Sequence, residues 1–182
     1  MPGPPRTPRN AGSSRVGRAL QRTFDGAVLS TVVLVAYASV FHLSVVRGTS
    51  MEPGIHDGDR ILVEPWSYLL DPVRRGDVVV LRSPVDPDVD YIKRVVGLPG
   101  EELVLTADGV WVDGVRIDEP YAISDAEPTQ LRVTVPEGHF FVLGDNRPRS
   151  ADSRDFGVVR AEDLRGRVDL RVWPPKRIGS ID

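Results

Sequence analysis

Hydrophobic residues are distributed along this chain in two different ways, and the first is a long run near the N-terminus. Residues 26–46 read GAVLSTVVLVAYASVFHLSVV, 21 residues without an Asp, Glu, Lys or Arg. An α-helix rises 1.5 Å per residue, so a helix of this length spans about 30 Å, the thickness of the hydrocarbon core of a bilayer. Several of these residues are β-branched, but in lipid a single segment satisfies its backbone only as a helix. We therefore predict one N-terminal transmembrane helix over residues 23–46.

Two other interpretations of this run stay open. A buried helix of a soluble protein can be equally apolar, although it is seldom this long. A cleavable secretory signal is the stronger alternative, because Ala36-Tyr37-Ala38 matches the small-x-small pattern of a cleavage site. The apolar run continues beyond Ala38 to Val46, where a signal peptide would turn polar, and this favours an uncleaved membrane anchor.

Beyond Arg47 the hydrophobic residues instead form many short runs separated by Gly, Pro and Asp, without a convincing amphipathic helix. Asp108-Gly109 and Asp113-Gly114 supply the positive φ angles that tight chain reversals need. Short strands at this spacing favour a mainly β fold, an antiparallel sheet or barrel-like domain, over alternating strands and helices. The predicted strands are Arg60–Val63, Asp77–Arg82, Asp90–Val96, Leu103–Thr106, Val110–Val112, Arg132–Val135, His139–Leu143 and Gly166–Val172.

Length and charge fix the domain organisation. The 182 residues suffice for one domain with short additions, and 41% hydrophobic residues are enough for a packed core. Residues 1–22 contain five arginines and no acid, whereas the chain from residue 47 onward has 18 basic and 25 acidic residues. We expect a basic, disordered cytoplasmic tail over 1–22 and, by the positive-inside rule, an extracytoplasmic folded domain over 47–182. An acidic body is also unsuited to binding nucleic acid.

Composition limits the chemistry. The chain has no cysteine and only three histidines, so a thiol nucleophile and a cysteine zinc site are excluded, and a histidine-based triad is disfavoured. Lys93 is one of two lysines against 21 arginines, and the period of a strand places it on the face of Tyr91 and Val95. Such a lysine can be a snorkelling side chain at a sheet edge. Alternatively, a buried lysine with a lowered pKa can act as the base for a serine nucleophile.

Four blocks in the chain carry a resemblance to the bacterial type I signal peptidases. They are SMEP at 50–53, RGDVVV at 75–80, YIKRVVGLPG at 91–100 and GDNRPRSADSR at 144–154, in this order. The joint pattern covers roughly residues 47–174 and is much more specific than any one block. The resemblance implies a membrane-anchored serine endopeptidase that removes signal peptides from exported preproteins.

The resemblance also assigns roles to residues. It implies Ser50 as the nucleophile, with its N–H as an oxyanion donor, and Lys93 as the general base. Gly48 stands where some relatives supply a second donor from a serine hydroxyl. Two shallow pockets for small side chains are implied as well, and we expect Met51 and Ile55 to line them. Ser150 is implied to hold the lysine amine in place, and the residues of the supporting loop are Asp145, Asn146, Arg147, Asp152 and Arg154.

The resemblance implies two partners, the lipid bilayer and preproteins that carry signal peptides. It implies no cofactor and no metal. Three other functions compete with this one. A self-cleaving repressor-type protease shares the serine–lysine pair, but the membrane segment and the lack of a helix-turn-helix pattern argue against it. A catalytically silent, membrane-anchored β module is another alternative, as is an anchored β domain with a single dedicated substrate.

Overall fold

The computed structural model describes residues 26, 28–31, 42–123 and 130–181. The predicted basic tail over 1–22 and most of the predicted transmembrane segment lie outside these residues. Gly26 and residues 28–31 are helical. No helix in the described ranges has the length and hydropathy that crossing a membrane requires. The chain divides into two units, Met1–Ser39 and Val40–Asp182.

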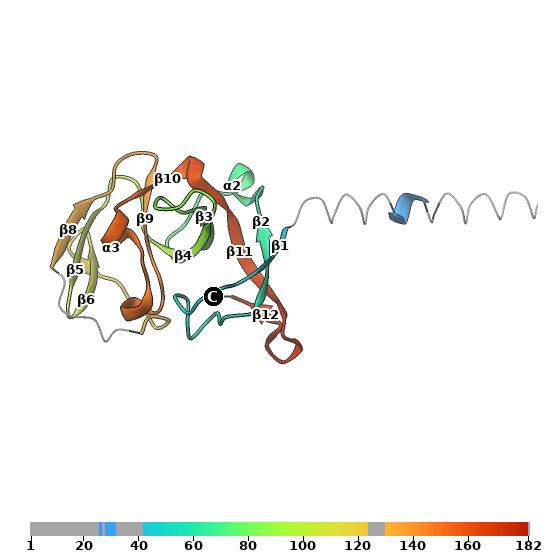
Figure 1. Cartoon of the computed structure of the whole chain (residues 1–182). Coiled ribbons are helices and arrows are strands. Elements are labelled where there is room, and N and C mark those ends of the chain that lie inside the picture. Colours follow the sequence, from blue (N-terminus) through green and yellow to red (C-terminus); the bar gives the residue numbers. More distant parts are fainter. Residues whose placement is uncertain (1–25, 27, 32–41, 124–129, 182) are drawn as a thin grey trace, which may run out of the picture. The chain divides into compact units, whose positions relative to one another are not determined.

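The second unit consists of strands joined by short helices and turns (Figure 1). All eight predicted strands are present, and the described chain holds no long helix beyond residue 47. In chain order the elements are β1 (His42–Val45), β2 (Arg60–Glu64), α2 (Ser67–Leu70), β3 (Val78–Arg82), β4 (Asp90–Gly97), β5 (Glu102–Thr106), β6 (Gly109–Val112), β7 (Val115–Arg116), β8 (Leu131–Thr134), β9 (His139–Leu143), η1 (Arg147–Arg149), α3 (Ser153–Phe156), β10 (Val159–Arg160), η2 (Ala161–Asp163), β11 (Leu164–Trp173), η3 (Pro175–Arg177) and β12 (Gly179–Ser180).

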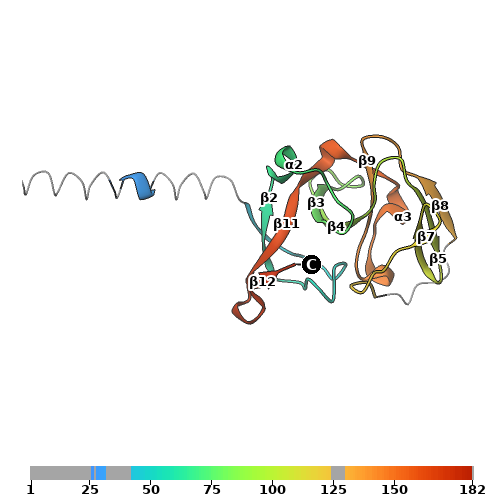
Figure 2. The ribbon, with the colours of Figure 1, turned by 180° about the vertical axis from the view of Figure 1, so that it is seen from behind.

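The strands form two antiparallel sheets, which confirms the predicted fold class for this unit. The larger sheet has the order β1-β2-β11-β3-β4-β9-β10, with β12 paired to β11. The smaller sheet has the order β7-β6-β5-β8 and lies beside β9, away from β1 and β2, in both views (Figures 1 and 2). The two Asp-Gly pairs form the turns on either side of β6, and Asp113 and Gly114 both have positive φ. This backbone matches the twist of the hairpin that they connect.

The N-terminal strand β1 corrects the sequence prediction. Its residues were assigned to the end of the transmembrane helix, but they pair antiparallel with β2, with His42 opposite Val63 and Val45 opposite Arg60. Only one of these four residues, Val45, is β-branched, so side-chain propensity does not decide their conformation. Backbone pairing with β2, which begins 15 residues after Val45, decides it. The predicted membrane helix therefore does not include His42–Val45.

The larger sheet is buried on both faces around the middle of β3. Val78 and Val80 join a hydrophobic cluster with Ile61 and Val168, whereas Val79 and Leu81 belong to a second cluster behind the sheet. Apolar residues at consecutive positions of one strand are expected where both faces are covered. This burial makes β3 and its neighbour β4 a rigid support for the side chains that β4 presents.

Candidate active site

The turn that carries Ser50 follows β1 and is held by backbone hydrogen bonds. Gly48 has a φ of +94°, which favours glycine, and its N–H donates to Asp57 Oδ1 at 2.8 Å. The N–H of Asn146 donates to the carbonyl of Ser50 at 3.0 Å, and its Nδ2 donates to the carbonyl of Thr49 at 3.1 Å. Asn146 therefore fixes the peptide on both sides of the Ser50 nitrogen. Within the part of the chain that the structure describes, the N–H of Ser50 itself donates to no protein group.

Lys93 projects from β4 toward this turn. Its Nζ lies 3.0 Å from Ser50 Oγ and 3.0 Å from the carbonyl oxygen of Ile92. The ring centroid of Tyr91 is 5.1 Å from the same nitrogen, and the lysine is only 4% exposed. An amine this buried is not a snorkelling side chain at a sheet edge, which was the alternative interpretation of the sequence.

Burial also changes the protonation of this amine. Loss of hydration disfavours the ammonium form and lowers the pKa of Lys93 to about 8, although the carboxylates of Asp152 and Asp145 oppose the shift. At this value about one lysine in ten is neutral at pH 7, against roughly one in several thousand for a free lysine. A neutral amine has a lone pair that can accept a proton from a hydroxyl.

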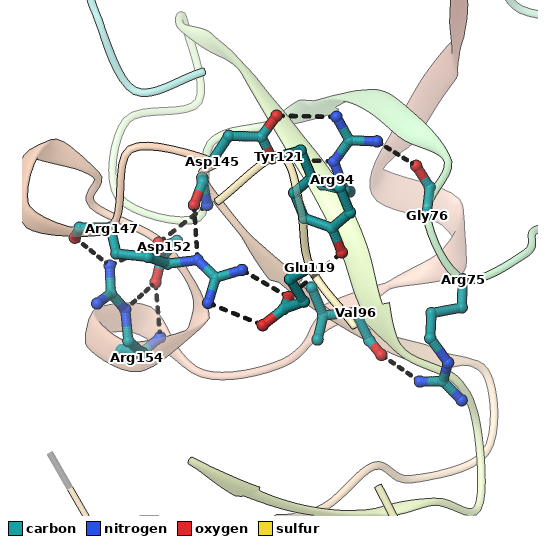
Figure 3. Close-up of polar contacts among 11 residues, drawn as sticks. Arg75, Gly76, Arg94, Val96, Glu119, Tyr121, Asp145, Arg147, Asp152 and Arg154 are labelled. Carbon is teal, nitrogen blue, oxygen red and sulfur yellow. Dashed lines mark hydrogen bonds and ion pairs between the residues drawn. The ribbon is translucent and has the colours of Figure 1, made fainter. Parts of the chain in front are cut away.

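A buried ion pair connects the lysine strand to the loop that holds Ser50 (Figure 3). Arg94, the residue after Lys93, donates from Nε and Nη2 to the two oxygens of Asp145 at 2.9 and 2.8 Å. Both side chains are almost fully buried, and the guanidinium also lies 4.0 Å from the ring centroid of Tyr121. Because Asp145 precedes Asn146, the pair couples the position of Lys93 to that of the Ser50 turn. The sequence analysis missed Arg94, although a charge within a valine-rich strand was a usable signal.

Arg147 anchors the same loop to a distant segment (Figure 3). Its Nη2 donates to Glu119 at 2.6 Å, and its Nε donates to the carbonyl of Gly144 at 3.0 Å. Arg147 and Glu119 are each 8% exposed. Ile123, four residues after Glu119, donates its N–H to the carbonyl of Asp145 at 2.8 Å. Glu119 and Tyr121 were not found from the sequence, because nothing in their local pattern differs from an exposed loop.

Asp152 and Arg154 close the other side of this loop, as the sequence analysis expected of supporting residues. Asp152 accepts from the N–H of Gly144 at 3.0 Å and from Nε of Arg154 at 2.8 Å. It also caps the short helix α3 in a reciprocal arrangement with Asp155. The guanidinium of Arg154 donates to the carbonyl of Arg147 at 2.6 Å. The loop is thus held from both ends.

Ser150 lies next to Ser50 but does not have the predicted contact with Lys93. Its Oγ is buried and has no hydrogen-bond partner among the described residues, and the lysine amine is hydrogen-bonded to Ser50 and Ile92 instead. The hydroxyl fits against Gly144, where a Cβ would clash with Ser150 and would lie 2.6 Å from the carbonyl oxygen of Ser50. Glycine at 144 therefore permits the close packing of the two serine segments.

The serine and the lysine open into a cleft of about 490 Å³. Met51 and Ile55, which we expected to line it, do not. Each is 1% exposed and packs in the core with Val46 and Ile61, because the turn after Ser50 directs them inward. Among the described residues, no cluster of His, Asp and Glu is suited to hold a metal. The lining residues are Ser44–Ser50, Ile61, Val80, Val89–Lys93, Arg149 and Ala151.

Two strand edges border the cleft. Among the described strands, β1 pairs with β2 alone, whereas β4 pairs with β3 from Asp90 to Arg94 and with β9 only from Arg94 onward. The backbone N–H and carbonyl of Val46 hydrogen-bond to residues just before β2. The backbone N–H and carbonyl of Val95 hydrogen-bond to residues just before β3. Since these directions alternate along a strand, the backbone groups of Val45 on β1 and Asp90 on β4 face the cleft.

A serine hydroxyl hydrogen-bonded to a buried lysine amine, in an open cleft bordered by free strand edges, defines a class of protein. It is the arrangement expected of a serine peptidase that uses an amine as its base. Comparison with known proteins places the chain among signal peptidases. The family model described as signal peptidase, peptidase S26, matches residues 21–173.

Individual relatives are similar over most of the chain. Signal peptidase I of Bacillus caldolyticus is 38% identical over 86% of this chain and 92% of its own length. Signal peptidase I of Bacillus licheniformis is 34% identical over 86% of this chain and 90% of its own. A solved structure of signal peptidase I from Enterococcus faecalis is 35% identical and covers 53% of this chain and 97% of its own, with a TM-score of 0.48. The chain belongs to the bacterial type I signal peptidase family, whose members are serine endopeptidases.

Proposed function

We propose that this protein is a membrane-anchored endopeptidase that removes signal peptides from exported preproteins, with Ser50 as nucleophile and Lys93 as general base. The observation that carries the proposal is the 3.0 Å contact between Ser50 Oγ and the buried amine of Lys93. Family membership supports the substrate class. The alternative functions, a single dedicated substrate or a silent binding module, are separated by the experiments below.

In the proposed reaction, the neutral amine of Lys93 accepts the hydroxyl proton of Ser50 as the oxygen attacks the carbonyl carbon of the scissile bond. The resulting ammonium then gives this proton to the departing amine, which leaves an acyl-enzyme on Ser50. Water, activated by the same amine, hydrolyses the ester. The carbonyl of Ile92 accepts one N–H of the amine and so orients its lone pair toward Ser50.

The negative charge that develops on the substrate oxygen needs donors. The N–H of Ser50 is suited to this role, since Asn146 fixes the carbonyls on both sides of it. Gly48 has no hydroxyl, and its N–H is engaged by Asp57 at 2.8 Å. A second donor from Gly48 would therefore need this bond to break.

We propose that the substrate lies extended between the free edges of β1 and β4 and is paired to them as an added strand. The apolar part of the cleft would accept the small side chains that precede the cleaved bond. Its lining there consists of Val45, Ile61, Val80 and Ile92, in place of the residues first expected. The substrate is thus held mainly through its backbone, which suits a peptidase that acts on many sequences.

The anchor is part of the proposal. The apolar run before His42 would hold the N-terminus in the membrane, with the arginine-rich tail in the cytoplasm and the catalytic domain outside. The test is extraction of the full chain from membranes. We expect resistance to high salt and release by detergent, whereas a repressor-type cytoplasmic protease would appear in the soluble fraction.

The catalytic proposal is tested with the full chain in detergent and a model preprotein that carries an Ala-x-Ala site. We expect Ser50→Ala and Lys93→Ala to lose at least 10³-fold in cleavage rate. Lys176→Ala changes the only other lysine, which is exposed on η3, and Ser180→Ala changes an exposed serine on β12. Both controls should cleave at the wild-type rate.

The outcomes discriminate between the functions. Loss of cleavage in both site variants, with the folded state intact by circular dichroism, supports the serine–lysine assignment. Cleavage that survives either change points to another nucleophile. A wild-type protein that binds the preprotein without cutting it would be the silent module, and one that cuts only a single preprotein would be the dedicated enzyme.

A further inference from the structure

Two arginines on the rim of the catalytic cleft have no ionic partner among the residues that the structure describes. Arg47 lies three residues before Ser50, and Arg149 ends η1 beside Ser150. Both line the cleft and are exposed. Across the described ranges of the chain, neither makes an ion pair or a side-chain hydrogen bond with another residue.

From residue 47 onward the chain has more acids than bases. The arginines next to the site, Arg94, Arg147 and Arg154, are each paired with a buried carboxylate. An isolated arginine on a surface is ordinarily a solvated side chain. Two of them on the rim of one cleft, one close in sequence to Ser50 and the other next to Ser150, form instead a concentrated positive field.

Acidic and basic residues line different parts of the cleft. Its one acidic lining residue, Asp90, lies three residues before Lys93 on β4, about 10 Å away along the strand. It faces Arg165 at 3.7 Å, which offsets its charge. β1 and the first part of β4 both run toward the serine–lysine pair and enclose the apolar part of the cleft. The two unpaired arginines therefore belong to the end at which the catalytic pair lies.

We infer that Arg47 and Arg149 select substrates with Asp or Glu in the first residues after the cleaved bond. The inference rests on the proposed function, because it takes the apolar part of the cleft as the site of the residues before that bond. The chain that follows the bond then leaves past Ser50 and the loop of Arg149. A carboxylate there gains two guanidinium neighbours, and a lysine there is repelled.

The test uses the full chain in detergent and peptides with a common Ala-x-Ala site, which differ only in the second residue after it: Asp, Ala or Lys. For the wild type we expect kcat/KM for the Asp peptide to exceed that for the Lys peptide about fivefold, since exposed ion pairs are weak. The preference should shrink as salt rises, because the Debye length falls from about 10 Å at 0.1 M to about 3 Å at 1 M. In the double variant Arg47→Glu/Arg149→Glu the preference should reverse.

A control reverses two arginines elsewhere. Arg116 and Arg132 are exposed on the small sheet and do not line the cleft, and Arg132, unlike the cleft arginines, pairs with Glu102. Arg116→Glu/Arg132→Glu should keep the wild-type order of the peptides. Equal cleavage of the Asp and Lys peptides by the wild type, or an unchanged order in the cleft variant, overturns the inference but leaves the peptidase assignment. Failure to cleave the Ala peptide would instead remove the proposed function.

Discussion

Ser50 Oγ and Lys93 Nζ lie 3.0 Å apart, although 43 positions separate the residues in the chain. Two neighbouring contacts set this distance. Arg94 pairs with Asp145, and Asn146 binds the backbone carbonyls around Ser50. The geometry of the proposed catalytic pair thus depends on a loop that carries neither Ser50 nor Lys93.

The pH dependence of cleavage should report the amine. Because burial lowers the pKa of Lys93 to about 8, we expect kcat/KM to rise about tenfold per pH unit below that value and to level off above it. The measurement is peptide cleavage in detergent between pH 6 and pH 10. A rate that stays constant over this range would contradict the role of Lys93 as base.

The buried Lys93 should also lower the stability of the folded protein at neutral pH. Its pKa is lower in the folded than in the unfolded protein, so the unfolded state binds more protons and stability rises as pH increases from about 8 toward the ordinary value of 10.5. The variant Lys93→Met lacks this pH dependence. The unfolding free energy of the variant minus that of the wild type should therefore fall by about 2 to 3 kcal/mol between pH 7 and pH 10. Urea denaturation at both pH values measures the change, and Lys176→Met should show none.

Removing the carboxylate of Glu119 should destabilise the site from a distance. In Glu119→Gln the buried guanidinium of Arg147 loses its charged partner, which costs about 3 to 5 kcal/mol for a buried pair. Glu102→Gln is the matched control, because its pair with Arg132 is exposed and should contribute less than about 1 kcal/mol. Equal losses of unfolding free energy in the two variants would show that the Arg147 pair is not structurally important.

A single methyl group at position 144 should disturb the catalytic geometry. In Gly144→Ala the new Cβ would overlap Ser150 and lie 2.6 Å from the carbonyl oxygen of Ser50. We expect at least a tenfold loss of kcat and about 1 to 3 kcal/mol of destabilisation, as for overpacked cores. Gly179→Ala adds the same methyl group where no atom lies within 4 Å and should have no effect. Wild-type kcat in the first variant would mean that the loop relaxes without moving Ser50.

The sequence alone determined those features that depend on local pattern. The pattern of apolar residues predicted eight strands, and all eight are present in the structure. This pattern is local, because side-chain period and turn residues act over a few positions. The scarcity of lysine and the blocks around Ser50 and Lys93 indicated the reacting pair. The long apolar run predicted a membrane segment, and its central part lies outside the described residues.

Only the tertiary structure decided the features that depend on distant partners. His42–Val45 became a strand because β2 pairs with it, and Met51 and Ile55 became core residues because the turn after Ser50 points inward. Glu119 became part of the site because Arg147, 28 positions away, reaches it. Local sequence sets the period of side chains along each element. Which faces are buried, and which charges meet, is set by packing between segments far apart in the chain.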